Sequence, residues 1–315
     1  MSAADDMAGP DQPAATDVRL DGRVAIVTGA AAGLGRAEAL ALAAAGADLV
    51  LCDVSPSLGD VVDAATGLGV KATAVTGDVG DSAVGGRLVA TALEAHGRLD
   101  VVVNNAGILR DRMLFGMSDA EWDDVVRVHL RGHFLVSRDA AAHWRDASKA
   151  SGGPVYGRLV NTASEAWLFG SAGQANYAAA KAGIAALTIS AARGLSRYGV
   201  RANVICPRAR TAMTAGVFGE APPEAGDGAT DPLSVEHVAP FVAYLASPAA
   251  DAVNGQVFVV HGGMVVHLAP PTVARRFDTT ADTWTAGELA ASLGPYFGGR
   301  DVDDVFACTD LMTGS

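Results

Sequence analysis

Short apolar runs rich in β-branched residues alternate along the chain with longer segments rich in alanine and leucine. Such runs are typical of strands buried on both faces of a parallel sheet, and the segments between them of covering helices. The pattern predicts strands at 24–28, 48–53, 72–78, 99–104, 155–162, 200–205 and 257–260 and helices at 34–45, 119–142, 177–197 and 235–246. Strands that alternate with helices predict an α/β fold, a parallel sheet with helices on both faces.

The domain organisation follows from where this alternation holds. We expect a flexible leader at 1–19, one α/β domain at 20–265, and an extension at 266–315 with a helix at 286–293. The extension is longer than the sheet needs and is expected to pack on the same domain or on a neighbouring subunit. Residues 213–232 are rich in Gly, Pro and Ala and acidic, a composition that fits a lid over a site.

Charge and cysteine usage exclude several classes of function. The net charge of −12 disfavours nucleic acid or an anionic membrane as the main partner. The apolar runs are shorter than the roughly 18 residues of a membrane span. The three cysteines are widely spaced, which favours a reducing cytoplasm and argues against a disulfide framework or a metal site.

A glycine-rich turn, T-G-A-A-A-G-L-G, links the first expected strand to the first helix. Its candidate cofactor residues are Gly29, Gly33, Leu34 and Gly35. Glycines at this place let the backbone approach a pyrophosphate at a helix N-terminus, although a merely tight turn has the same composition. Asp53, eighteen residues after the last glycine, stands where a carboxylate accepts hydrogen bonds from the adenosine ribose. Its charge would repel a 2′-phosphate, which favours NAD over NADP; the alternative is a solvated acid at a strand end.

Tyr177 and Lys181 are one turn apart on an expected helix, and Ser164 lies thirteen residues before the tyrosine. A phenol is an effective acid or base near neutral pH only if its pKa falls from about 10, and a nearby ammonium can lower it. A tyrosine and a lysine at this spacing alone also occur on ordinary solvated helices. In combination with the serine and the glycine turn, they predict proton transfer to or from an alcohol oxygen.

Together with the sequence N-N-A-G at 104–107, these motifs resemble the short-chain dehydrogenase/reductase family over residues 20–265. The resemblance implies a Rossmann-type, doubly wound sheet of about seven strands, hydride transfer between a nicotinamide and a carbinol or carbonyl, and a homodimer or homotetramer. It implies that Ser164 hydrogen-bonds the substrate oxygen and that Lys181 holds the nicotinamide ribose. The other cofactor residues that it implies are Asp78 and Val79 at the adenine, Asn105, Ala106 and Gly107 beside adenine and ribose, and Thr211 at the nicotinamide carboxamide.

Two positions depart from the usual pattern of that family. His129 stands where most members have an asparagine that orders a proton-relay water, and Pro207 is followed by Arg208 in place of glycine. The same region is similar to the (3R)-hydroxyacyl-CoA dehydrogenase unit of peroxisomal multifunctional enzymes type 2 and to stand-alone actinobacterial relatives, and that unit also has histidine at the relay position. An imidazole can pass a proton, so His129 is a candidate catalytic residue; the alternative is a packed helix histidine.

Two further sets of loop residues each allow two interpretations. The arginines at 110, 112, 208 and 210 follow strand ends and could pair with the phosphates of a CoA or remain solvated, and residues 167–169 could line an apolar pocket or pack as core.

The resemblance implies NAD-dependent interconversion of a (3R)-3-hydroxyacyl-CoA and its 3-oxo form, in fatty-acid or sterol side-chain breakdown. Alternatives are a 3-oxoacyl-carrier-protein reductase, a hydroxysteroid dehydrogenase, or a catalytically silent dinucleotide sensor.

Overall fold

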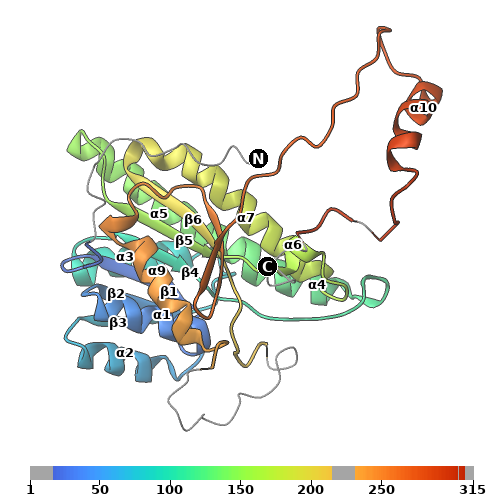
Figure 1. Ribbon diagram of the computed structural model, residues 1–315. Helices are drawn as coiled ribbons and strands as arrows, with labels where there is room; N and C mark the ends of the chain where they lie inside the picture. Colours follow the sequence, from blue (N-terminus) through green and yellow to red (C-terminus); the bar gives the residue numbers. More distant parts are fainter. Residues whose placement is uncertain (1–16, 215–230, 304, 309–315) are drawn as a thin grey trace.

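A computed structural model describes residues 17–214, 231–303 and 305–308 of the chain. In this part of the chain one sheet of eight strands has the order β3-β2-β1-β4-β5-β6-β7-β8 (Figure 1). All neighbouring strands are parallel except the last pair, β7 and β8. The strands are β1 (Val24–Thr28), β2 (Asp48–Asp53), β3 (Ala72–Thr76), β4 (Val101–Asn104), β5 (Gly157–Thr162), β6 (Val200–Pro207), β7 (Val257–His261) and β8 (Met264–His267).

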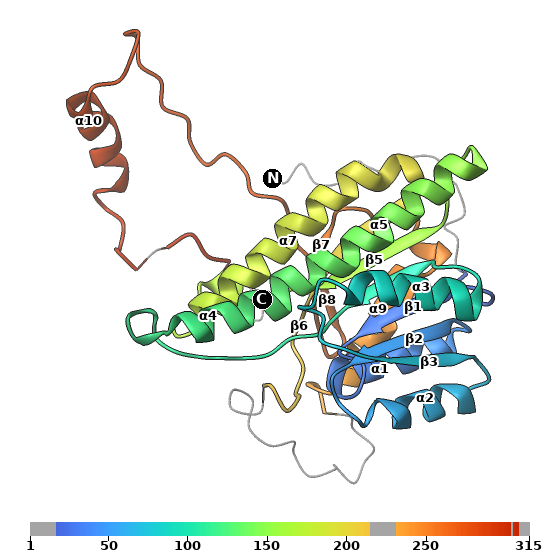
Figure 2. The same cartoon turned by 180° about the vertical axis from the view of Figure 1, so that it is seen from behind.

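Helices cover both faces of the sheet, and each layer buries its own apolar cluster. On one face lie α1 (Gly33–Ala44), α2 (Leu58–Gly67) and α9 (Ala239–Ala246). On the other face lie α3 (Val84–His96), α5 (Gly132–Ser151) and α7 (Ala175–Leu195) (Figure 2). The shorter helices are α4 (Asp119–Val126), α6 (Ala166–Phe169) and the single turns η1 (Leu114–Gly116), η2 (Arg127–Arg131), η3 (Ser196–Tyr198), η4 (Val235–His237) and η5 (Pro248–Ala250).

The strand order creates the crevice in which a ligand can lie. The chain leaves β1 toward β2 and β3 and then returns to β4 on the other side of β1, so the connections at the carboxyl ends of β1 and β4 diverge. In open α/β sheets, such a switch point is where ligands bind.

The predicted fold class is confirmed, with three differences in detail. The helix expected at 119–142 is α4 and α5 joined by η2, one turn of π-helix, and it extends to Ser151. The sheet has an eighth strand, because the chain turns back after β7 and adds an antiparallel edge strand. Helices α2 and α3 had not been placed from the sequence pattern.

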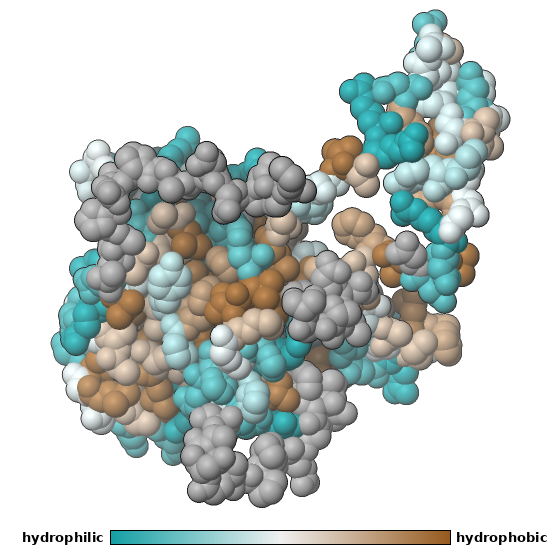
Figure 3. All heavy atoms as spheres, in the orientation of Figure 1, coloured by the Kyte–Doolittle hydropathy of each residue, from teal (hydrophilic) through white to brown (hydrophobic). Residues whose placement is uncertain are grey.

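The C-terminal extension leaves the body after β8 and returns to it at its end. Helix α10 (Ala286–Phe297) has no buried side chain and stands clear of the body (Figures 1 and 2). In the space-filling view, apolar and polar residues are mixed along this projecting segment (Figure 3). The Cys308 amide then donates to the Leu168 carbonyl at 2.9 Å.

Some expectations fall on residues outside this description. The leader expected at 1–19 is described only from residue 17, and the lid expected at 213–232 lies mostly outside the described residues. None of the helices in the described residues is long and apolar enough to cross a membrane.

Candidate active site

The glycine-rich turn brings backbone close to the point where β1 and β4 diverge. Gly29 and Gly33 have φ of +68° and +54°, a region that favours glycine. A Cβ on Gly35 would collide with the carbonyl oxygen of Gly29, so helix α1 can start this close to the turn only with glycine there. Leu34 and Gly33 line the cleft beside this turn. The geometry fits a pyrophosphate at the N-terminus of α1.

The end of β4 is tied to this turn in part through the Thr28 hydroxyl. The amides of Asn105 and Ala106 lie 3.1 and 3.3 Å from Thr28 Oγ1. A Cβ on Gly29 would lie 2.8 Å from the Cα of Ala106, so the two loops pack backbone against backbone. Asn105, Ala106 and Gly107 all line the cleft, as the sequence predicts for residues beside a dinucleotide.

Asp53 ends β2 with a carboxylate that is already oriented. Its Oδ2 accepts from the amide of Ala31 at 3.0 Å, and its Oδ1 accepts from the amide of Ser55 at 2.9 Å. The side chain is half-buried and lines two neighbouring hollows, one at the ends of β2 and β3 and one that extends to the ends of β5 and β6. Arg36 is exposed and is not among the residues that line them.

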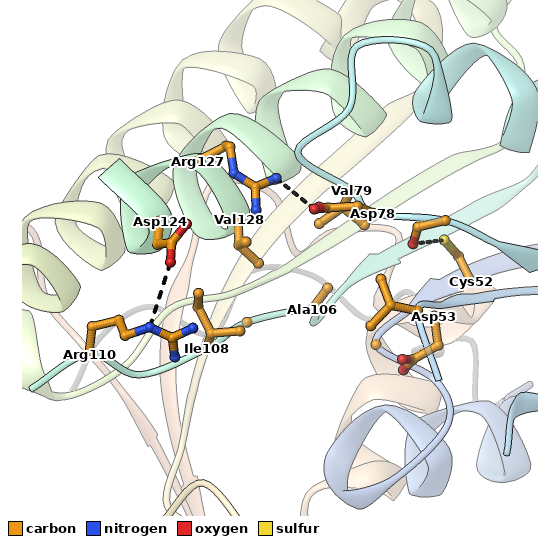
Figure 4. Close-up of a pocket in the computed structure, with 14 residues that line it drawn as sticks. Cys52, Asp53, Asp78, Val79, Ala106, Ile108, Arg110, Asp124, Arg127 and Val128 are labelled. Atoms are coloured by element: carbon orange, nitrogen blue, oxygen red, sulfur yellow. Dashed lines mark hydrogen bonds and ion pairs between the residues drawn. The ribbon is translucent and has the colours of Figure 1, made fainter. Parts of the chain in front are cut away.

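A hollow of about 260 Å³ lies beyond Asp53 at the ends of β2 and β3 (Figure 4). Val79, Ile108 and Val128 form its apolar sides, and Asp78 and Arg127 form an ion pair at its edge with Nη1–Oδ2 at 2.7 Å. Burial raises the pKa of Asp78, but hydrogen bonds from the Gly80 amide and Arg127 outweigh it and leave that pKa lowered. Apolar sides with a fixed acceptor at the edge are chemically suited to an adenine ring.

A second hollow of about 740 Å³ joins the glycine turn to the carboxyl ends of β5 and β6. Ser164, Tyr177 and Lys181 meet here, as predicted, from the loop after β5 and the first two turns of α7. Lys181 Nζ donates to the carbonyl of Thr162 at 2.6 Å and lies 5.4 Å from the centre of the Tyr177 ring. Thr211, from the loop after β6, lines the same cleft.

The direction of one predicted pKa shift is wrong for these residues alone. The sequence predicts that Lys181 lowers the pKa of Tyr177, but burial raises the pKa of Tyr177 to about 12, although the Ser164 hydroxyl opposes this rise. Burial also lowers the pKa of Lys181 to about 7, although Cys206 and Glu38 raise it. Burial is the largest cause of both shifts, so a lower pKa at Tyr177 requires further positive charge in the cleft.

His129 enters the cleft from η2 and contacts Tyr177. Its ring lies edge-on to the Tyr177 ring, with centroids 5.1 Å apart and planes at 86°. Its Nε2 lies 3.0 Å from the amide nitrogen and 2.7 Å from the carbonyl oxygen of Ile108, and buried Nδ1 has no hydrogen-bond partner within the described residues. Burial, with the Lys181 charge second, lowers the pKa of His129 well below its usual value, so the imidazole is neutral. Nδ1 is therefore a buried polar atom that the described residues leave unpaired, in a ring that contacts Tyr177.

Comparison with known proteins agrees with this geometry. The short chain dehydrogenase family model matches residues 23–220. The chain belongs to the short-chain dehydrogenase family. It is 61% identical over 300 residues to hydroxyacyl-CoA dehydrogenase ChsB1 of Mycobacterium tuberculosis, covering 93% of this chain and 94% of that protein. A short chain dehydrogenase crystal structure from Mycobacterium avium superimposes with a TM-score of 0.78 at 42% identity, over 89% of this chain and 96% of that chain.

A further relative is the mouse peroxisomal multifunctional enzyme type 2, 41% identical over 81% of this chain. The alignment covers 34% of that longer enzyme. Members of the short-chain dehydrogenase family are oxidoreductases that bind a nicotinamide dinucleotide, so the site described above belongs to an oxidoreductase acting on a secondary alcohol.

The sequence allows either phosphate binding or solvation for the four loop arginines. In the structure each of them forms an ion pair with a carboxylate. The pairs and their N–O distances are Arg110–Asp124 at 3.6 Å, Arg112–Glu121 at 3.1 Å, Arg208–Glu165 at 2.6 Å and Arg210–Asp231 at 3.0 Å. A phosphate at any of them would have to compete with that carboxylate.

Residues 167–169, for which the sequence allows either a pocket wall or core packing, divide between the two. Phe169 lines the cleft. Phe169, Trp167 and Leu168 all pack in one apolar cluster, together with Val266 and Cys308.

Two polar residues of the cleft had no role in the sequence-based predictions. Glu165 lines the cleft beside Ser164, and Gln174 lines it while its amide donates to Asp111 Oδ2 at 3.0 Å. The only signal for them was position, because Glu165 follows Ser164 and Gln174 precedes Tyr177 by three residues.

Proposed function

We propose that this short-chain dehydrogenase interconverts a (3R)-3-hydroxyacyl-CoA and its 3-oxoacyl-CoA with NAD as cofactor. The observation that carries the substrate class is the 61% identity to hydroxyacyl-CoA dehydrogenase ChsB1 over 93% of this chain. The cleft supports it, because Leu109, Phe169 and Met213 add apolar lining next to Ser164 and Tyr177.

Each catalytic side chain has one role in the proposed reaction. Tyr177 removes the hydroxyl proton as the carbonyl forms, and returns it in the reverse direction. Ser164 donates a hydrogen bond to the same substrate oxygen and stabilises its developing charge. A bound nicotinamide would accept or supply the hydride and, when oxidised, would add the positive charge that favours the Tyr177 phenolate.

Lys181 and His129 take part in the proton transfer rather than in the hydride transfer. Lys181 uses one N–H for Thr162 and keeps two for the nicotinamide ribose and a water. His129 holds Nδ1 where a water could link the lysine to the tyrosine. The remaining proposed cofactor contacts are Gly29, Gly33, Leu34 and Gly35 at the pyrophosphate, Asp53 at the ribose, Asp78 and Val79 at the adenine, Asn105, Ala106 and Gly107 beside them, and Thr211 at the carboxamide.

The preference for NAD follows from Asp53. Its two oxygens are fixed by backbone amides and remain able to accept from the two ribose hydroxyls. A 2′-phosphate would meet this carboxylate, and neither Ala32 nor Val54 brings a cation there.

The test is a substrate panel with NAD and with NADP, followed through the absorbance of the reduced nicotinamide. It compares (3R)- and (3S)-3-hydroxyacyl-CoAs, the same acyl groups on a carrier protein, and hydroxysteroids. Turnover of the (3R)-acyl-CoA with NAD is expected. A higher kcat/KM with a carrier-protein substrate and NADP, or with a hydroxysteroid, would overturn the substrate, and NAD binding without turnover of any alcohol would favour a sensor.

We further propose that the chain assembles as a homodimer or homotetramer in which the extension at 266–315 contacts a neighbouring subunit. Support comes from α10, which has no buried side chain although Leu289 and Phe297 lie on it. Light scattering of the full chain and of a chain shortened after His267 tests this. The same number of subunits per particle in both would contradict it.

A further inference from the structure

The carboxylate of Asp78 is held at both oxygens before any ligand touches it. Oδ1 accepts from the amide of Gly80 at 2.8 Å. Oδ2 accepts from Nη1 of Arg127 at 2.7 Å, the interaction drawn in Figure 4. Two hydrogen bonds from different directions fix the plane of a carboxylate. Each oxygen keeps a second lone pair for a further donor.

The loop that carries Asp78 is shaped to receive Arg127. A Cβ on Gly80 would collide with the Arg127 guanidinium and would lie 3.0 Å from its Cγ. Arg131 donates from Nε to the carbonyl of Gly80 at 3.2 Å. Two arginines therefore hold this loop from one side, and both belong to η2.

The π-helical turn η2 connects this loop to the catalytic end of the cleft. Between the two arginines it carries His129, whose ring contacts Tyr177. π-Helical turns inside α-helices occur frequently at functional sites, because they re-aim side chains that a regular helix would misplace.

Fold stability does not explain the pair. The side chains of Arg127 and Asp78 are 41% and 42% exposed, and ion pairs with that exposure contribute little to folding. Both residues line the hollow beside Val79, Ile108 and Val128, so a flat ligand there would touch the pair directly.

We propose that Arg127 is a positioning residue for purine recognition: it fixes the Asp78 carboxylate so that a free lone pair accepts from the 6-amino group of adenine. The inference deepens the proposed function, since it rests on the adenine of NAD occupying this hollow. A purine with oxygen at position 6 presents an acceptor to the same carboxylate and is rejected.

The experiment measures binding directly by titration calorimetry, with NAD and with nicotinamide hypoxanthine dinucleotide, in which the 6-amino group is a 6-oxo group. For the unmodified chain we expect NAD to bind about tenfold more tightly, as for the loss of a hydrogen bond to a charged group. In Arg127→Gln, the affinity for NAD should fall about fivefold to tenfold while that for the analogue changes little, so the preference approaches one.

Arg87→Gln is the matched control. Arg87 also approaches the end of β3, where its Nη2 donates to the carbonyl of Thr76 at 2.9 Å, but it does not touch Asp78. Loss of this cation affects both anionic dinucleotides alike and leaves their ratio unchanged. An Arg127→Gln variant that behaves like Arg87→Gln, with an unchanged ratio, would overturn the positioning role.

Asp78→Asn separates this inference from the cofactor proposal. An amide can donate to a 6-oxo group, so this variant should lose or reverse the preference for NAD. An unchanged preference in Asp78→Asn would show that adenine does not lie at this hollow, and the cofactor placement would fail. A changed preference there with an unchanged one in Arg127→Gln would remove only the role of Arg127. Should Arg127→Gln fail to fold, Arg127→Lys, which keeps the charge but not the guanidinium geometry, gives the same comparison.

Discussion

Arg208 and Glu165 form a two-point ion pair inside the cleft, with Nη2–Oε1 at 2.6 Å and Nε–Oε2 at 2.8 Å. Glu165 directly follows Ser164, and Arg208 stands where the family usually has glycine. The departure at position 208 is therefore matched by a carboxylate on the neighbouring loop. The pair links the loop after β5, which carries the serine, to the loop after β6.

We predict that replacing one partner of this ion pair destabilises the fold more than replacing both partners. The side chains are 23% and 10% exposed, so Arg208→Met or Glu165→Leu alone leaves a nearly buried charge, at a cost of about 2–4 kcal/mol in the free energy of unfolding. The double variant should recover most of that loss. Urea unfolding of the three variants measures it.

Arg276→Met is the control for that cycle, because its pair with Asp278 has side chains 81% and 63% exposed. We expect less than about 1 kcal/mol from it. Additive losses in the double variant would mean that Arg208 and Glu165 are not energetically coupled.

Tyr177→Phe should abolish turnover and leave cofactor binding intact. The substitution removes only the hydroxyl that transfers the proton, and positioned acid–base catalysis contributes about 10²–10⁴-fold in rate. The affinity for NAD should change by no more than about threefold, since the ring and its contact with His129 remain. Single-turnover kinetics and calorimetric titration measure the two quantities. Tyr198→Phe, in η3 beyond the far end of α7, is the control and should keep the full rate.

Much of the fold could be predicted because its strands are buried on both faces and so contain unbroken apolar runs. β1 and β2 have the predicted boundaries for this reason. The eighth strand lacks this signal, because Met264 and Val265 are exposed at the sheet edge and only tertiary pairing with β7 defines the strand. Local periodicity also cannot distinguish a π-helical turn from a continuous helix, so the break at η2 was not foreseen.

The site could be predicted where spacing fixes geometry, as in Tyr177 and Lys181 on one helix face. It could not be predicted where segments distant in sequence meet. Glu165 and Arg208 are forty-three residues apart, and nothing local in either loop indicates the pairing. The pKa of Tyr177 was also beyond the sequence, because its direction depends on how completely the fold buries the phenol.

His129 variants distinguish a relay from a packing role. His129→Asn keeps an amide that can bond to Ile108 and should retain most of kcat, whereas His129→Phe loses both ring nitrogens and should lower kcat about tenfold or more. Because burial keeps the imidazole neutral, neither variant should remove an ionisation near the usual histidine pKa from the pH–rate profile. Steady-state kinetics across pH measure both effects. Full activity in His129→Phe would establish the packing interpretation.

Glu38 makes the stability of the fold depend on pH. Its carboxyl is fully buried in α1, and neither oxygen has a hydrogen-bond partner within the described residues. Burial raises its pKa from 4.5 to about 8, opposed by the charge of Lys181. Between those two values the unfolded chain has released the proton and the folded chain still holds it. The free energy of unfolding therefore falls as pH rises through this window, by up to about 5 kcal/mol for a shift of this size.

Glu38→Leu removes this titration. The free energy of unfolding of this variant should therefore exceed that of the unmodified chain by more at pH 8 than at pH 5. Lys181 gives the opposite slope, since its lowered pKa lets the folded chain lose a proton from about pH 7 upward while the unfolded chain keeps it to about 10.5. Because the charge of Glu38 raises the pKa of Lys181, Glu38→Leu also lowers that pKa further, and the difference between the two proteins contains both titrations. Urea unfolding at a series of pH values measures the difference, and one that is the same at pH 5 and pH 8 would mean that Glu38 does not titrate in this window.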